Sequence, residues 1–153
     1  MLKIGEKSPN FTLPRDGQGS LSLSDYNGRI FVIYFYPKDD TPGCTKEAID
    51  FTQNLTKFNA IGTSVIGVSK DSVTKHDKFI AKHNLEIPLL SDITVQMCED
   101  FEVWKEKSMY GKTYMGIERT TFLIDGDGII REIWRKVRVK GHVDAVLSAV
   151  LAL

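Results

Sequence analysis

The sequence changes its periodicity between residues 29 and 60, and no other feature constrains the fold as strongly. Residues 29–37, RIFVIYFYP, are almost all β-branched or aromatic, which predicts a strand covered on both faces and ended by Pro37. From Pro42 onward the apolar residues recur at steps of three and four, which predicts one buried face of an amphipathic helix. The residues of this stripe are Cys44, Ala48, Phe51, Leu55 and Phe58. The pattern indicates an α/β fold in which a buried strand leads directly into a helix.

The remaining elements extend this pattern into one domain, residues 1–153. Short β runs on either side of PRDGQG predict an N-terminal hairpin, and two β runs joined around DGDG predict a second one near the C-terminus. Between and after them we expect strands at 63–71 and 87–92, and helices at 72–84, 94–104 and 140–153, with Ser72 as a helix cap. The order predicts a central mixed β-sheet with helices on both faces, parallel where helices intervene and antiparallel at the final hairpin.

Composition restricts the partners that this chain can have. Lys and Arg together number 20, as do Asp and Glu, so no overall charge would attract nucleic acid or an anionic membrane. The N-terminus has no apolar run of signal-peptide length, and no later segment has the roughly 18 apolar residues of a membrane span. We therefore expect a cytoplasmic protein that acts on small molecules or individual proteins. Its two cysteines, Cys44 and Cys98, are too few for a disulfide scaffold.

Cys44 occupies a position that favours a reactive thiol. If Thr41 caps the helix and Pro42 is its first residue, Cys44 lies in the first turn, among unpaired N–H groups and at the positive end of the helix dipole. Full ionisation of a free thiol raises its reactive fraction by only about 30-fold, roughly 2 kcal/mol. A thiol enzyme therefore also needs a hydroxyl and a cation beside the sulfur. Thr41 can supply the hydroxyl, Pro37 can exclude water, and the cation has to come from another part of the chain.

Two blocks of the sequence resemble one family. Pro37-x-x-x-Thr41-x-x-Cys44, within FYPKDDTPGCTKEA, resembles the peroxidatic motif of the peroxiredoxins, and its fuller wording is similar to the bacterioferritin comigratory protein (Q) class. The block VWKEKSMYGKTYMGIERTTFLID is similar to the same class and aligns Arg119 with the family's active-site arginine. The resemblance covers nearly the whole chain. It implies a thioredoxin-like fold and reduction of hydrogen peroxide or organic hydroperoxides without a metal or bound cofactor.

The resemblance also implies a role for each residue of the motif. The Cys44 thiolate would attack the peroxide and become a sulfenic acid. Thr41 and Arg119 would hold the two peroxide oxygens, and the backbone N–H groups of Gly43 and Cys44 would orient them. Members of this class are often monomers or weak homodimers.

The sequence departs from the class in its second cysteine. Many members carry a resolving cysteine five residues after the first, where this chain has Ile49, or in the stretch that matches HDKFIAKHN, which has none here. Cys98 remains, and its simplest interpretation is a small buried residue beside Met97 and Phe101. We therefore predict a one-cysteine cycle in which glutathione, glutaredoxin or thioredoxin reduces the sulfenic acid. An atypical two-cysteine cycle through Cys98 is the alternative.

Several residues also have simpler interpretations. Alone, Cys44 could be an inert core residue, and Arg119 a surface charge paired with Glu118. His76 and His83 lack zinc-site spacing and are predicted to be exposed polar histidines, so no metal site is expected. Residues 110–115, with two tyrosines and a methionine, are predicted to form a loop before Arg119 that either covers the pocket or has no role.

The sequence is also compatible with other functions. A general disulfide oxidoreductase normally needs a Cys-x-x-Cys pair, which the chain lacks. A redox sensor would be oxidised once and then wait for its partner, whereas a holdase would bind unfolded clients even without Cys44. Peroxide consumption with a thiol donor distinguishes the predicted peroxidase from these alternatives.

Overall fold

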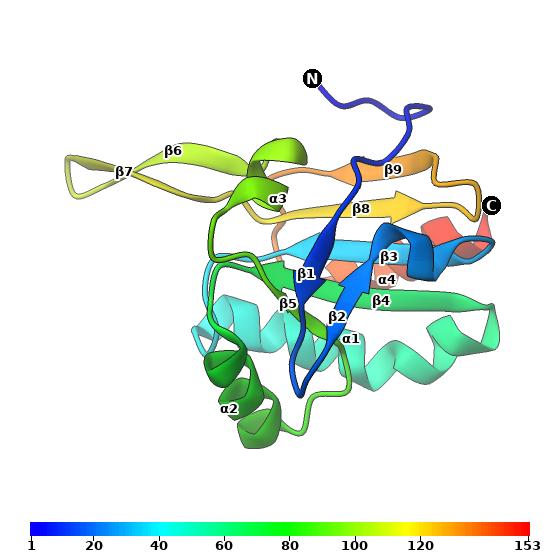
Figure 1. The fold of residues 1–153 in the computed structure, drawn as a ribbon, viewed down its shortest axis with the longest axis horizontal. Helices are drawn as coiled ribbons and strands as arrows, with labels where there is room; N and C mark the ends of the chain where they lie inside the picture. The colour runs from blue at the N-terminus through cyan, green and yellow to red at the C-terminus, as the bar shows by residue number, and fades with distance from the viewer.

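A five-stranded mixed sheet forms the centre of the computed structural model, which describes all 153 residues. Its strand order is β5 (Leu89–Ser91), β4 (Thr63–Ser69), β3 (Ile30–Phe35), β8 (Thr120–Ile124) and β9 (Ile130–Trp134). The first three strands are parallel, and β8 and β9 are antiparallel to their neighbours (Figure 1). The predicted mixed sheet with its antiparallel final hairpin is therefore confirmed.

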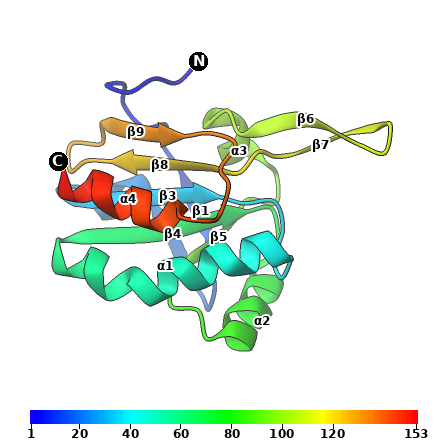
Figure 2. The ribbon, with the colours of Figure 1, turned by 180° about the vertical axis from the view of Figure 1, so that it is seen from behind.

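The two faces of the sheet are covered by different kinds of element. Helices α1 (Pro42–Ala60) and α4 (His142–Leu151) lie across one face (Figure 2), and α2 (Val73–His83) packs at its β5 edge. The other face is covered by the hairpin of β1 (Thr12–Pro14) and β2 (Ser20–Ser22), the 3-10 helix η1 (Leu23–Tyr26) and the short helix α3 (Gln96–Asp100). The expectation of helices on both faces thus holds only in part, because the long helices share one face.

Alternation along β3 divides the core into two clusters. Phe31, Ile33 and Phe35 point to the face covered by the N-terminal hairpin and α3, whereas Val32 and Tyr34 point to the face covered by α1 and α4. All five side chains are almost completely buried. The sheet therefore separates two apolar layers, as expected for a strand that is apolar on both faces.

Residues 104–117 correct the sequence prediction. They form a hairpin, β6 (Trp104–Met109) and β7 (Lys112–Ile117), that projects from the body of the molecule (Figures 1 and 2). Tyr110 and Gly111, both with positive φ, make its two-residue turn. The sequence predicted a loop only at 110–115 and a helix at 94–104, whereas α3 ends at Asp100 and Trp104 begins β6. Most side chains of the hairpin are polar or exposed and so show no pattern of burial that would predict strands. No helix of the chain is both long and apolar enough to span a membrane.

Candidate active site

The N-terminus of α1 presents backbone donors beside Cys44. The first helical hydrogen bond runs from the Thr45 N–H to the Thr41 carbonyl, at 2.8 Å, so the N–H groups of Gly43 and Cys44 have no acceptor within the helix. Thr41 is the N-cap residue as predicted, but its hydroxyl does not cap. It donates instead to the Lys38 carbonyl, at 2.8 Å. The free N–H groups are therefore available to a ligand.

Arg119 lies beside the sulfur of Cys44. Its Nη2 donates to Cys44 Sγ at 3.3 Å, and its Nη1 donates to Glu47 Oε1 at 2.7 Å. Arg119 precedes β8, and residue 120 of that strand pairs with Phe35, the last residue of β3. The antiparallel pairing therefore carries Arg119 to the end of β3 where the chain turns into α1. The sequence predicted both Cys44 and Arg119 for the site, and the fold brings them into contact; the pairing with Glu118 considered above does not occur.

Burial makes this cluster electrostatically unusual. Cys44 is 1% exposed and Glu47 is completely buried. Burial, opposed by the charge of Arg119, raises the pKa of Glu47 to about 7. Burial acts to lower the pKa of Arg119, but the negative charges of Glu47 and Cys44 outweigh it and raise that pKa. Arg119 is therefore a permanent cation fixed against the sulfur.

Gly43 allows the guanidinium to approach the helix. A Cβ at this position would lie 3.1 Å from Arg119 Nη2 and 3.8 Å from its Cζ. A larger residue would push the guanidinium away from Cys44. The absence of a Cβ at Gly43 therefore leaves room for the guanidinium beside the Cys44 sulfur.

Buried hydrogen bonds hold the loop that carries Pro37 and Thr41. Asp39 accepts from Tyr36 Oη at 2.6 Å and lies 2.6 Å from His76 Nδ1, while its N–H donates to Asp71 at 2.9 Å. The prediction that His76 is exposed is wrong, because its side chain is completely buried. Pro37 is half-buried at the start of this loop. These contacts fix the approach of the chain to α1.

His76 is held in one orientation by hydrogen bonds to both ring nitrogens. Its Nε2 lies 2.8 Å from the Leu90 carbonyl, which can only accept, so Nε2 is the donor. Burial acts to lower the pKa of His76, but its hydrogen bond and charge interaction with Asp39 prevail and raise it. His83 is partly exposed and contacts Asp40 at 2.9 Å. Neither histidine belongs to a group of three or more potential metal ligands.

Sequence reasoning missed Glu47, Asp39 and His76. A signal for Glu47 exists, since it follows Cys44 by three positions and lies on the apolar stripe of α1, where an unpaired carboxylate would be costly. Asp39 and His76 are 37 residues apart and meet only through the packing of α2. No pattern in the sequence links them.

Cys98 lies in a different environment. It is completely buried in the cluster with Phe35, Met97 and Phe101, on the face of the sheet opposite to Cys44. Its N–H donates to Asp92 at 2.8 Å. Burial, followed by the hydrogen bond and charge of Asp92, raises the pKa of its thiol far above the usual range. Both cysteines are free thiols.

Known proteins resemble the chain over almost its whole length. A model of the AhpC/TSA family matches residues 4–133. Peroxiredoxin Bcp of Bacillus subtilis is 50% identical over 147 residues, which cover 96% of this chain and 94% of that protein. A putative peroxiredoxin bcp of Coxiella burnetii is also 50% identical, over 96% of this chain and 97% of that one.

Solved structures extend the similarity to the fold. The bacterioferritin comigratory protein of Xanthomonas campestris, studied for its alkyl peroxide reduction activity, matches with a TM-score of 0.89 and 48% identity, over 93% of this chain and 90% of that one. A mutant of PrxQ from Xylella fastidiosa matches with a TM-score of 0.94 and 43% identity, over 99% of this chain and 97% of that one.

Proposed function

The chain belongs to the AhpC/TSA family of peroxiredoxins and is a thiol-dependent peroxidase with a thioredoxin-like fold, and on this premise we propose that Cys44 is its peroxidatic residue in a one-cysteine cycle. Hydrogen peroxide and organic hydroperoxides are the proposed substrates. One observation carries the proposal: Cys44 is the cysteine whose sulfur is fixed against a cation, Arg119, at a helix N-terminus.

The reaction follows from the contacts of Cys44. Its thiolate attacks the terminal peroxide oxygen, so that a sulfur–oxygen bond forms as the oxygen–oxygen bond breaks. Sulfur loses two electrons and becomes a sulfenic acid, and the second oxygen leaves as water or an alcohol after it takes a proton. Arg119 stabilises the negative charge that develops on the leaving oxygen.

Neighbouring groups orient the peroxide. The hydroxyl of Thr41 donates its hydrogen bond to the Lys38 carbonyl, so its oxygen can accept a hydrogen bond from the peroxide O–H. The N–H groups of Gly43 and Cys44 donate to the peroxide, and Pro37 limits access of water. Glu47 positions Arg119 through their 2.7 Å contact.

The position of Cys98 supports an external reductant. A disulfide needs sulfurs about 2 Å apart and Cα atoms within about 7 Å. Cys44 and Cys98 belong to core clusters on opposite faces of the sheet, so their union would require the core to open. Glutathione, glutaredoxin or thioredoxin is therefore the proposed reductant, and the cycle through Cys98 is the alternative. We expect the protein to work in the cytoplasm as a monomer or weak homodimer.

Steady-state peroxide consumption tests this proposal. The wild type, Cys44→Ser and Cys98→Ala are each assayed with glutathione alone, with glutaredoxin and with thioredoxin. We expect Cys44→Ser to lose activity by at least about 1,000-fold, as for other lost nucleophiles, and Cys98→Ala to retain it with at least one donor. A folded Cys98→Ala protein that is inactive with every donor would refute the one-cysteine cycle.

A further inference from the structure

Lys107 of β6 reaches back along the projecting hairpin toward the active site. In the hairpin register Lys107 lies opposite Tyr114, and Gly116 lies two residues nearer the body on the same face. The Lys107 Cδ and Cε atoms lie 3.3 and 3.6 Å from the position that a Gly116 Cβ would occupy. The side chain therefore leans over Gly116 toward the base of the hairpin, and Arg119 follows Gly116 by three residues.

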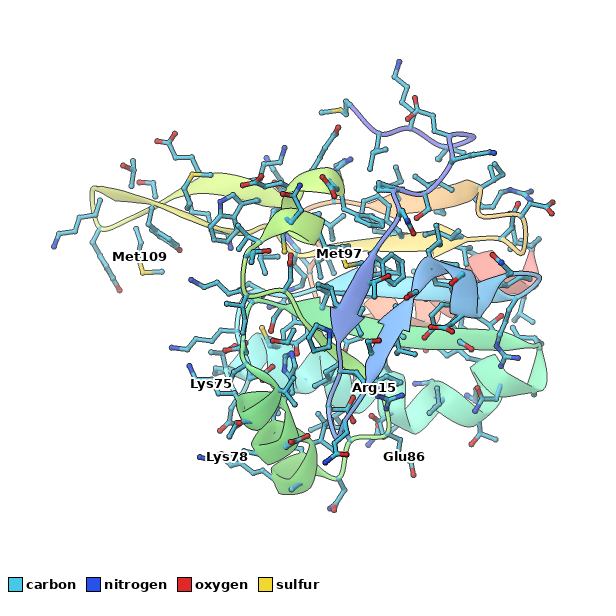
Figure 3. The ribbon with its side chains drawn as sticks, in the orientation of Figure 1. Arg15, Lys75, Lys78, Glu86, Met97 and Met109 are labelled. Atoms are coloured by element: carbon cyan, nitrogen blue, oxygen red, sulfur yellow. The ribbon has the colours of Figure 1, made fainter.

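The tip of the hairpin points into solvent, as the position of Met109 illustrates (Figure 3). Lys112, opposite Met109, is exposed there. Lys107 is instead half-buried. Two lysines of the same hairpin face thus differ in their distance from the body of the protein.

Lys107 has no ionic partner, although it is partly removed from water. Its ammonium makes no hydrogen bond or ion pair within the protein, whereas Lys46 and Lys82 pair with Asp50 and Asp40. Burial, followed by the positive charge of Arg119, lowers the pKa of Lys107, while the charges of Cys44 and Glu118 act in the opposite direction. An unpaired, half-buried cation is costly. Its side chain is directed toward the base of the hairpin, and Arg119, three residues beyond Gly116, contacts the Cys44 sulfur there.

The proposed reaction needs an acid that the residues around Cys44 do not otherwise provide. The oxygen that leaves is a hydroxide or an alkoxide and must gain a proton. Arg119 holds its protons too tightly, and the hydroxyl proton of Thr41 is donated to Lys38. Glu47 contacts Nη1 of Arg119 whereas the sulfur contacts Nη2, so the guanidinium stands between this carboxyl and Cys44.

Building on the proposed function, we propose that Lys107 is the general acid that protonates the leaving oxygen when Cys44 attacks a peroxide. In this step the thiolate forms a bond to the terminal oxygen, the oxygen–oxygen bond breaks, and a proton moves from the Lys107 ammonium to the released oxygen. The products are the sulfenic acid, water or an alcohol, and a neutral amine that regains its proton from water.

Peroxides with different leaving groups test this role. The rate of Cys44 oxidation is measured in single turnovers with hydrogen peroxide, tert-butyl hydroperoxide and peroxyacetic acid, whose leaving acetate needs no proton. We expect Lys107→Met to slow the reaction with the first two by about 100-fold, the lower range of general acid catalysis. Its effect on peroxyacetic acid should be much smaller. Lys112→Met, at the exposed end of the same hairpin face, is the matched control and should react like the wild type.

Two further variants separate proton donation from charge. Lys107→Arg keeps the cation but is a much weaker acid, so it should remain slow with hydrogen peroxide. Gly116→Val keeps the lysine but fills the space under its side chain and so displaces it. This variant should also lose more rate with hydrogen peroxide and tert-butyl hydroperoxide than with peroxyacetic acid, but by less than Lys107→Met does. Equal losses with all three oxidants, no loss, or full activity of Lys107→Arg would each overturn the proposal. A wild type that forms no sulfenic acid at Cys44 would refute the proposed function itself, and the role of Lys107 with it.

Discussion

The two faces of the central sheet each bury one cysteine, and the chemical surroundings of the two thiols differ. Cys44 and Cys98 are 1% and 0% exposed, so access to water does not distinguish them. Around Cys44 the structure gathers a guanidinium, a carboxyl group and a helix N-terminus. Around Cys98 it gathers phenylalanine and methionine side chains and the carboxylate of Asp92. Nearby positive charge, rather than exposure, therefore distinguishes the thiol that we propose to react with peroxide from the one that we propose to take no part.

The largest expected effect on this contrast comes from removing the cation at Cys44. Arg119→Met should lower the rate of Cys44 oxidation by hydrogen peroxide by about 100- to 1,000-fold, because loss of one transition-state donor costs that much in other enzymes. Arg135→Met is the matched control, because Arg135 lies over the Phe122 ring in the core cluster of Cys98. It should leave the rate within about 2-fold of wild type. The rates are measured by stopped-flow. If the two variants lost the same amount of Cys44 oxidation rate, the charge beside Cys44 would have no special role compared with the charge on the other face.

A smaller effect concerns stability. Cys98→Ser should lower the free energy of unfolding by about 1–3 kcal/mol, because it places a hydroxyl in an apolar cluster. Cys44→Ser should cost less, since Arg119 remains beside it as a donor. Urea unfolding of the two variants measures the difference. A larger loss for Cys44→Ser would show that the environments are less distinct than their contacts indicate.

A third effect depends on pH. Because the pKa of Glu47 is raised from its ordinary value of 4.5 to about 7, the folded protein binds more protons than the unfolded chain between these values. The contribution of Glu47 to stability therefore decreases as pH rises through this window, by on the order of 3 kcal/mol. Glu47→Gln should lack this decrease. To test this, the unfolding free energies of the wild type and Glu47→Gln are measured at pH 5 and at pH 8. If the change in unfolding free energy between the two pH values were the same for both proteins, the prediction would be contradicted.

Much of the fold follows from the sequence because its signals are local. The buried strand before Pro37, the amphipathic stripe of α1 and the DGDG turn each predict an element that the structure contains. The hairpin of β6 and β7 was missed because its strands are mostly exposed, so their residues lack the alternation of apolar and polar side chains that predicts a half-buried strand. Its pairing depends on the turn at Tyr110 and Gly111 and on contacts between exposed side chains.

The candidate site was predictable only where one segment carries it. Thr41, Gly43 and Cys44 lie within one turn, and a family resemblance added Arg119. The partners of these residues come from the tertiary structure: Glu47 meets Arg119 because β8 pairs with β3. The separation of the two cysteines by the sheet likewise depends on which face each helix covers, and periodicity alone does not determine this.

In the proposed cycle, Cys44 is oxidised to a sulfenic acid without the participation of Cys98. The most direct test is the intact mass of the reduced protein after one equivalent of hydrogen peroxide, with a sulfenic-acid trap present and the modified peptide mapped. We predict one trap adduct on Cys44, with Cys98 still a free thiol. Loss of two hydrogens without an adduct, and a peptide that joins Cys44 to Cys98, would contradict the account.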